Sequence, residues 1–252
     1  MSPALRTAAL MSLLVAGDAF VLAGEASAGV EVEVEASIVA ASRNDTRIPG
    51  DTGTRISLVD DLSTAAAPAF RLRLGYRVHE RHLISALYAP LQVTARGSVS
   101  GNVEFMGATY PARTPLLAIY RFNSYRLTYR YSIVWQDGLD VAVGFTAKIR
   151  DAETSLYGVE ARRKTNIGFV PLLNAHVAWR PGQGAFGVVL DVDALAAPQG
   201  RAADVLLAGT WSFREDLELR AGYRTVEGGA DNDEVYSFAW LHYGTIGLKM
   251  SL

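Results

Sequence analysis

Apolar and polar residues alternate along much of this chain, and residues 125–135 show the pattern most clearly. Every odd-numbered position there is aliphatic or aromatic, from Tyr125 to Trp135, whereas the even-numbered positions include Arg126 and Arg130. In an extended strand these two sets lie on opposite faces. A soluble sandwich would bury the apolar face, whereas a membrane barrel would turn that face to lipid and the arginines to its lumen.

Comparable alternation predicts ten strands, at residues 30–41, 68–78, 83–96, 122–135, 139–150, 167–180, 185–195, 203–214, 217–226 and 235–252. Four very short connections alternate with the longer connections 42–67, 97–121, 151–166, 196–202 and 227–234. Short turns on one rim and longer loops on the other are typical of transmembrane β-barrels. The pattern therefore predicts an all-β chain that forms a closed antiparallel up-and-down transmembrane β-barrel of about ten strands, within a range of roughly 8–12. An even number places both termini on the short-turn rim.

Aromatic residues recur just before the short turns. Trp135, Trp179 and Trp211 each share the parity of the apolar residues in their strand, and Tyr76 has a comparable place. Aromatic rings at one height outside a barrel form an interfacial girdle. The alternative is that they are core aromatics of a soluble sandwich.

The opposite face of the strands is charged, and in a barrel it lines the lumen, where isolated ions are costly. We expect a lumen charge network of Glu31, Glu33, Arg71, Arg73, Arg77, Arg126, Arg130, Lys148, Arg150, Asp191, Asp193, Arg220, Arg224 and Lys249. Strand order predicts that the first two glutamates meet arginines of the second strand, with Lys249 at the same end. The pairs expected nearer the outer rim join Arg126, Lys148, Arg150 and Arg224 to Asp191, Asp193 and Asp204.

The N-terminus, residues 1–28, has the pattern of a secretory signal peptide. Arg6 supplies a positive charge, residues 8–22 are largely apolar, and Ala26-Ser27-Ala28 forms a small-x-small cleavage site. The alternative is an uncleaved anchor or a buried helix. Residues 29–252 then form a single barrel domain.

Composition excludes several classes of function. The chain has no cysteine, which removes disulfides, thiolate metal sites and catalytic thiols. After residues 1–28 the chain holds 23 basic and 24 acidic residues, a balance that argues against nucleic acid as a partner. No cofactor or metal is predicted: the acidic loop with Asp231, Asp233 and Glu234 fits a solvated loop better than a cation site.

Residues 29–252 resemble the outer-membrane β-barrel superfamily of Gram-negative bacteria. The resemblance rests on the cleavage site, on strands such as 70–78 and 125–135, and on a last strand that alternates from Gly244 to Leu252. In that superfamily the last residue is commonly aromatic, whereas here it is leucine. The resemblance implies an outer-membrane location, contact with membrane lipid and lipopolysaccharide, and recognition by the outer-membrane assembly machinery. The sequence leaves the oligomeric state open, and a monomer is favoured.

Size and chemistry favour a non-enzymatic envelope protein with a structural, narrow-channel or surface-binding role. The interior of a barrel of about eight strands is nearly filled by its own side chains, whereas water-filled porins have about sixteen strands. A ten-stranded lumen lined by long charged side chains is therefore expected to be largely plugged. Omptin proteases need a histidine high on the outer rim, where none is expected. His242 could serve a Ser–His lipid deacylase, but no serine is expected at its level. The rivals are an outer-membrane enzyme acting on lipid or peptide, and a soluble periplasmic barrel that carries a ligand around an apolar cavity.

Overall fold

The computed structural model describes residues 29–198 and 200–252 and forms a closed antiparallel barrel of ten strand positions. The predicted signal peptide, residues 1–28, lies outside the described residues. The barrel strands are β1 (Gly29–Arg47), β4 (Ala67–Val78), β5 (His82–Ala89), β6 (Gln92–Gly97), β9 (Leu116–Gln136), β10 (Leu139–Tyr157), β11 (Ala161–Trp179), β12 (Phe186–Ala197), β13 (Gly200–Ser212), β14 (Leu217–Asp231) and β15 (Tyr236–Ser251). Strands β5 and β6 both pair with β9 and share one position, so the predicted strand count is confirmed.

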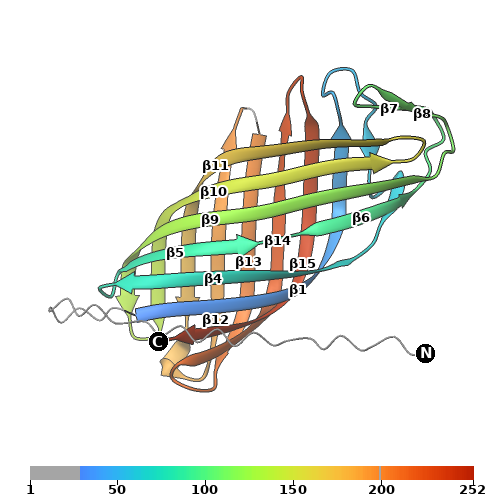
Figure 1. Ribbon diagram of the computed structural model, residues 1–252. Coiled ribbons are helices and arrows are strands. Elements are labelled where there is room, and N and C mark those ends of the chain that lie inside the picture. The colour runs from blue at the N-terminus through green and yellow to red at the C-terminus, as the bar shows by residue number, and fades with distance from the viewer. Residues whose placement is uncertain (1–28, 199) are drawn as a thin grey trace, which may run out of the picture.

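The first and last strands close the barrel. β1 and β15 pair in antiparallel register from Glu31 opposite Ser251 to Arg47 opposite Tyr236. The backbones of Val30 and Leu252 also exchange two hydrogen bonds, of 3.0 and 2.8 Å. The start of β1 and the end of β15 therefore lie together on the rim of short turns, at the end opposite the β7–β8 hairpin (Figure 1).

The two faces of the wall are those of a membrane barrel. Leu127 and Tyr129 on β9 are 57% and 42% exposed on the outside, whereas Arg126 and Arg130, which flank them in sequence, are buried in the lumen. A soluble carrier would require the reverse, with charges outside and an apolar cavity inside, so that rival does not fit the structure. No helix among residues 29–198 and 200–252 is long and apolar enough to cross a bilayer.

The strands extend further outward than the alternation predicts. β1 continues to Arg47 rather than residue 41, and β10 and β11 continue until only residues 158–160 separate them. The predicted long loops 151–166, 196–202 and 227–234 are wrong in this respect, because most of their residues belong to paired strands. Backbone pairing does not need an apolar outer face above the membrane, so the alternation ends before the ladder does.

Two outer connections, residues 48–66 and 98–115, carry structure of their own. They hold β2 (Ile56–Ser57), β3 (Leu62–Thr64), β7 (Val103–Phe105) and β8 (Ala108–Tyr110). Fully buried side chains, among them Ile56, Phe105 and Tyr110, form an apolar cluster with the outer ends of β6 and β9. This outer cap gives the barrel a conventional hydrophobic core at its outer end.

Candidate functional site

A compact set of ions crosses the lumen at mid-height. Asp204 on β13 accepts hydrogen bonds from three guanidiniums, of Arg71 (3.0 Å, β4), Arg126 (2.6 Å, β9) and Arg224 (2.7 Å, β14). All four side chains are buried. Strands from opposite sides of the barrel are thus joined through one carboxylate.

Two further carboxylates balance the charge of this cluster. Arg126 also donates to Asp193 at 2.7 Å, and Arg224 donates to Glu35 at 2.7 Å. With three acids and three arginines, the set is neutral, which is what allows it to be buried. We call it the mid-lumen cluster: Glu35, Arg71, Arg126, Asp193, Asp204 and Arg224.

The charges nearer the short-turn rim form a second layer. Glu31 lies 3.0 Å from both Arg77 and Lys249, at the strand level that the sequence predicts. Glu33 lies 3.8 Å from Arg73 and 3.2 Å from Arg220. A further pair joins Arg130 to Asp191 at 2.7 Å.

The predicted ion pairs of Lys148 and Arg150 with lumen aspartates are wrong. Within the part of the chain that the structure describes, neither Lys148 nor Arg150 lies within ion-pair distance of an acid. The Lys148 ammonium instead lies 4.7 Å from the centre of the Phe122 ring, and Arg150 donates to Asn166. The three aspartates expected to bind them are occupied by other arginines of the lumen.

The mid-lumen cluster separates two cavities. One, of about 700 Å³, opens toward the short-turn rim and is lined by second-layer charges such as Glu33, Arg130 and Asp191. The other, of about 360 Å³, lies in the outer half of the barrel. None of the six cluster residues lines either cavity. We call the second cavity the outer vestibule.

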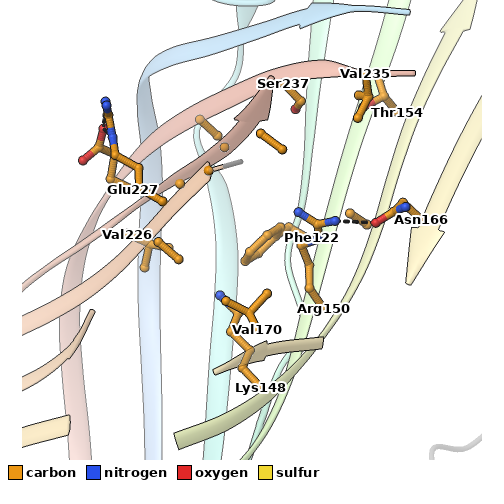
Figure 2. A pocket seen from close by; sticks show the side chains of 18 of the residues that line it. Phe122, Lys148, Arg150, Thr154, Asn166, Val170, Val226, Glu227, Val235 and Ser237 are labelled. Carbon is orange, nitrogen blue, oxygen red and sulfur yellow. Dashed lines mark hydrogen bonds and ion pairs between the residues drawn. The ribbon is translucent and has the colours of Figure 1, made fainter. Parts of the chain in front are cut away.

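The outer vestibule combines an apolar wall with two cations that have no acid partner. Figure 2 shows Lys148 and Arg150 beside Phe122 and Val170, with a hydrogen bond from Arg150 to Asn166. The Arg150 Nε atom is buried and makes no hydrogen bond. The other cations of the vestibule are paired, Lys164 with Glu234 and Arg201 with Glu227.

The aromatic girdle is only partly as expected. Tyr76, Trp179 and Trp211 lie on the outer face and are 48%, 53% and 44% exposed. Trp135 does not share their orientation, because the register between β9 and β10 shifts beside it. It lines the cavity at the short-turn rim, where its ring lies 4.7 Å from the Arg77 guanidinium. A β-bulge, which reverses the alternation, is the physical reason.

A serine–histidine pair lies on the outer wall, where no serine is predicted at the level of His242. The Ser42 hydroxyl and His242 Nε2 are 2.7 Å apart, and the Tyr223 hydroxyl is hydrogen bonded to His242 Nδ1. Ser42 is the extra residue of a β-bulge, since Ala41 pairs with Leu241 and Arg43 with Trp240. The predicted strand stops at residue 41 and leaves Ser42 in a loop, so the sequence pattern places no serine beside His242.

The other histidines make no comparable arrangement. His176 is buried in the lumen, with Nδ1 3.8 Å from Asp191, and His82 Nδ1 lies 2.9 Å from the Tyr129 hydroxyl. Among the residues that the structure describes, no three or more His, Cys, Asp or Glu side chains are grouped as they would be to hold a metal ion.

Solved outer-membrane barrels are similar to this chain in structure. The outer membrane protease OmpT from Escherichia coli matches with a TM-score of 0.56 and 9% identity, over 92% of this chain and 99% of that one. An outer membrane channel from Pseudomonas putida F1 matches at 0.43 and 9% identity, over 91% and 97% of the two chains. The attachment invasion locus protein Ail of Yersinia pestis matches at 0.40 and 8% identity, over 88% and 98%. No family model and no curated protein matches the chain. The first likeness shows the fold of an outer-membrane barrel.

Proposed function

We propose that this protein is an integral outer-membrane barrel that is closed to solutes at mid-height and acts through its outer half. The observation that carries the proposal is the mid-lumen cluster, in which Arg126 reaches both Asp193 and Asp204 between the two cavities. A narrow channel is thereby disfavoured relative to a structural or surface-binding role.

The energetics of the cluster support a permanent closure. Removing one partner of a buried ion pair typically costs about 3–5 kcal/mol, because a charge is left uncompensated. Opening a path past Asp204 would break its hydrogen bonds to three arginines together. Thermal fluctuation therefore rarely opens the lumen.

The outer wall supports the proposed location. Outward residues such as Val34, Ile38, Leu127 and Phe145 are 50%, 62%, 57% and 68% exposed, which suits lipid rather than water. We propose lipid and lipopolysaccharide as the surroundings of this belt, a monomer as the unit, and the assembly machinery as the partner that inserts it.

Conductance in planar bilayers tests the closure. We expect no steps from the wild-type barrel and discrete steps from the double variant Arg126→Ser, Asp204→Ser, which removes two central side chains. The matched control is Arg214→Ser, Asp216→Ser, an exposed pair on the short-turn rim. Steps of porin size from the wild-type protein would overturn the proposal.

The Ser42–His242 pair favours a second candidate function, hydrolysis of a lipid ester at the outer wall. With the proton of Nδ1 donated to Tyr223, Nε2 is free to act as a base toward the Ser42 hydroxyl. The pair lies where the apolar belt ends: Ile38 and Ala40 lie below Ser42 on β1, whereas Arg43 follows it. Ester carbonyls of membrane lipids lie at such a boundary.

In this candidate reaction, Ser42 Oγ attacks the ester carbonyl carbon while His242 Nε2 accepts the hydroxyl proton. The alcohol leaves with that proton, and water then releases the acid and restores the serine. Release of fatty acid from phosphatidylglycerol vesicles is the measurement. We expect Ser42→Ala to abolish it and Ser63→Ala, an exposed outer serine, to leave it unchanged; a wild-type protein without release rejects this candidate.

A further inference from the structure

The barrel wall is incomplete between β11 and β12. These strands pair from Trp179 opposite Val188 only as far as Leu173 opposite Ala194. β12 ends three residues later, at Ala197, whereas β11 continues to Ala161. Among the described residues, no backbone hydrogen bond joins the outer half of β11 to β12.

This gap begins within the apolar belt. On β11 the outward residues Leu173, Phe169 and Ile167 are 54%, 64% and 74% exposed, and polar Thr165 follows only above them. Unpaired backbone is costly in hydrocarbon and is tolerated where it lines a cavity. Pro171, which has no N–H to leave unpaired, lies in this stretch of the edge.

The gap leads into the outer vestibule. Phe169, Val170 and Pro171 from β11 line this cavity together with Leu195 and Ala197 from β12. Both edges of the opening are therefore walls of the same cavity, which connects the side of the barrel with its interior.

The chemistry of the vestibule defines what fits there. Its wall is mostly apolar, its volume of about 360 Å³ is within the usual range for small-ligand sites, and its floor carries Lys148 and Arg150 without acid partners. An anionic group would offset the cost of leaving these two cations unpaired in an enclosed site. A guanidinium donates two parallel hydrogen bonds to a carboxylate or a phosphate.

We infer that the outer vestibule binds a single-chain amphiphile with an anionic head, which enters from the outer leaflet through the gap between β11 and β12. The head is held by Lys148 and Arg150, and the acyl chain lies along Val170, Pro171 and Leu195 toward the lipid. Two lipid classes offer this chemistry, free fatty acids and anionic lysophospholipids. The inference rests on the proposed membrane location, not on the closed lumen.

Binding is tested with the full barrel in phosphatidylcholine nanodiscs. The probes are palmitate and palmitoyl-lysophosphatidylglycerol, with zwitterionic palmitoyl-lysophosphatidylcholine as the comparison. We expect Lys148→Met and Arg150→Met each to weaken binding of the anionic probe at least about tenfold, since each removes a charge-assisted hydrogen bond. Arg163→Met, which removes an exposed cation of β11 that does not line the vestibule, is the matched control and is expected to leave affinity unchanged.

The two anionic probes distinguish the two lipid classes. Tight binding of palmitate alone assigns a carboxylate head and hence a free fatty acid, whereas tight binding of palmitoyl-lysophosphatidylglycerol alone assigns a phosphate head and hence a lysophospholipid. Binding of all three probes with equal affinity, or of none, overturns the inference. Equal losses in all three variants overturn it as well. Bilayer conductance and membrane fractionation are separate measurements, so this failure is distinguishable from failure of the proposed function.

The route is tested by photo-crosslinking. A palmitate carrying a diazirine near its chain end is added to the same nanodiscs, and adducts are mapped by mass spectrometry. We expect adducts on residues 169–171 and 195–197 that excess palmitate competes away. Adducts spread evenly around the outer wall, at Ile38 and Leu127 as much as at the gap, would refute entry at β11 and β12.

Discussion

Arg126 and Asp204 meet across the full width of the lumen: β10, β11 and β12 separate their strands along the wall, yet Arg126 Nη2 lies 2.6 Å from an Asp204 carboxylate oxygen. Both side chains are buried. Their pairing ties together segments 78 positions apart in the chain. The barrel is thus held from inside by ions as well as around its wall by the strand ladder.

Asp204 is expected to contribute more to stability than any exposed acid. Asp204→Ala leaves three buried arginines with one acceptor fewer, and we expect a loss of about 3–5 kcal/mol in the free energy of unfolding. Urea titration in lipid vesicles measures it. The control Asp216→Ala breaks an exposed pair with Arg214 and is expected to cost about 0–1 kcal/mol. Equal losses for both variants would contradict a buried network.

The lipid-facing assignment of β9 has its own test. Leu127→Arg places a cation in the middle of the outer apolar belt, and we expect a loss of about 2–4 kcal/mol in the free energy of unfolding. Thr165→Arg, above the belt on β11, is expected to cost about 0–1 kcal/mol. Both values are measured from unfolding in lipid vesicles, with the heat-dependent shift in gel mobility as the monitor of the folded fraction. A neutral Leu127→Arg would mean that this face does not meet hydrocarbon.

The strands and their two faces could be predicted because a wall between lipid and lumen imposes a strict two-residue period. The pairing of Glu31 with Arg77 followed from the same register. The period fails at bulges, and two differences from the predicted pattern lie there. Trp135 lies on the inner face, and Ser42, which the pattern places in a loop, is the extra residue of a bulge.

Other features had no local signal in the sequence. The outer vestibule depends on where β11 stops pairing with β12, and this is decided by the unequal lengths of two hairpins rather than by residue type. Lys148 was expected to find an aspartate, but competition among the arginines for Asp193 and Asp204 depends on side-chain packing across the barrel. Pro171 is the one hint of an open edge that the sequence holds.

The outer cap is expected to unfold independently of the barrel. Phe105 on β7 is fully buried in the outer apolar cluster, so Phe105→Ala should weaken the packing of the cap by about 3–5 kcal/mol. Limited proteolysis should then cut residues 98–115 faster while the heat-dependent gel shift stays unchanged. Ser100→Ala, on the exposed surface of the same connection, is the control, and the protease should cut this variant at the wild-type rate. Loss of the gel shift in Phe105→Ala would mean that cap and barrel unfold together.

The outer rim is expected to loosen in acid because of Asp45. Its carboxylate accepts hydrogen bonds from Arg43 (2.8 Å) and Arg55 (2.6 Å), above the apolar belt. Burial acts to raise the pKa of Asp45, but the two guanidiniums outweigh it and hold the pKa below its ordinary value of 3.8. A carboxyl whose pKa is depressed by folding stabilises the fold above its unfolded pKa, and this contribution is lost as pH falls through the folded pKa.

We therefore expect hydrogen exchange in residues 48–58, corrected for the intrinsic rate at each pH, to accelerate as the pH falls below the ordinary Asp45 value. Asp45→Asn cannot titrate, so its protection should be lower than wild type near neutral pH and should not fall further through this carboxyl in acid. Hydrogen exchange in the β10–β11 hairpin, measured in the same experiment, is the control for effects of low pH that do not involve Asp45. Wild-type protection that stays constant through the acid range, or an Asp45→Asn variant that loses protection in parallel with it, would show that Asp45 does not hold the rim.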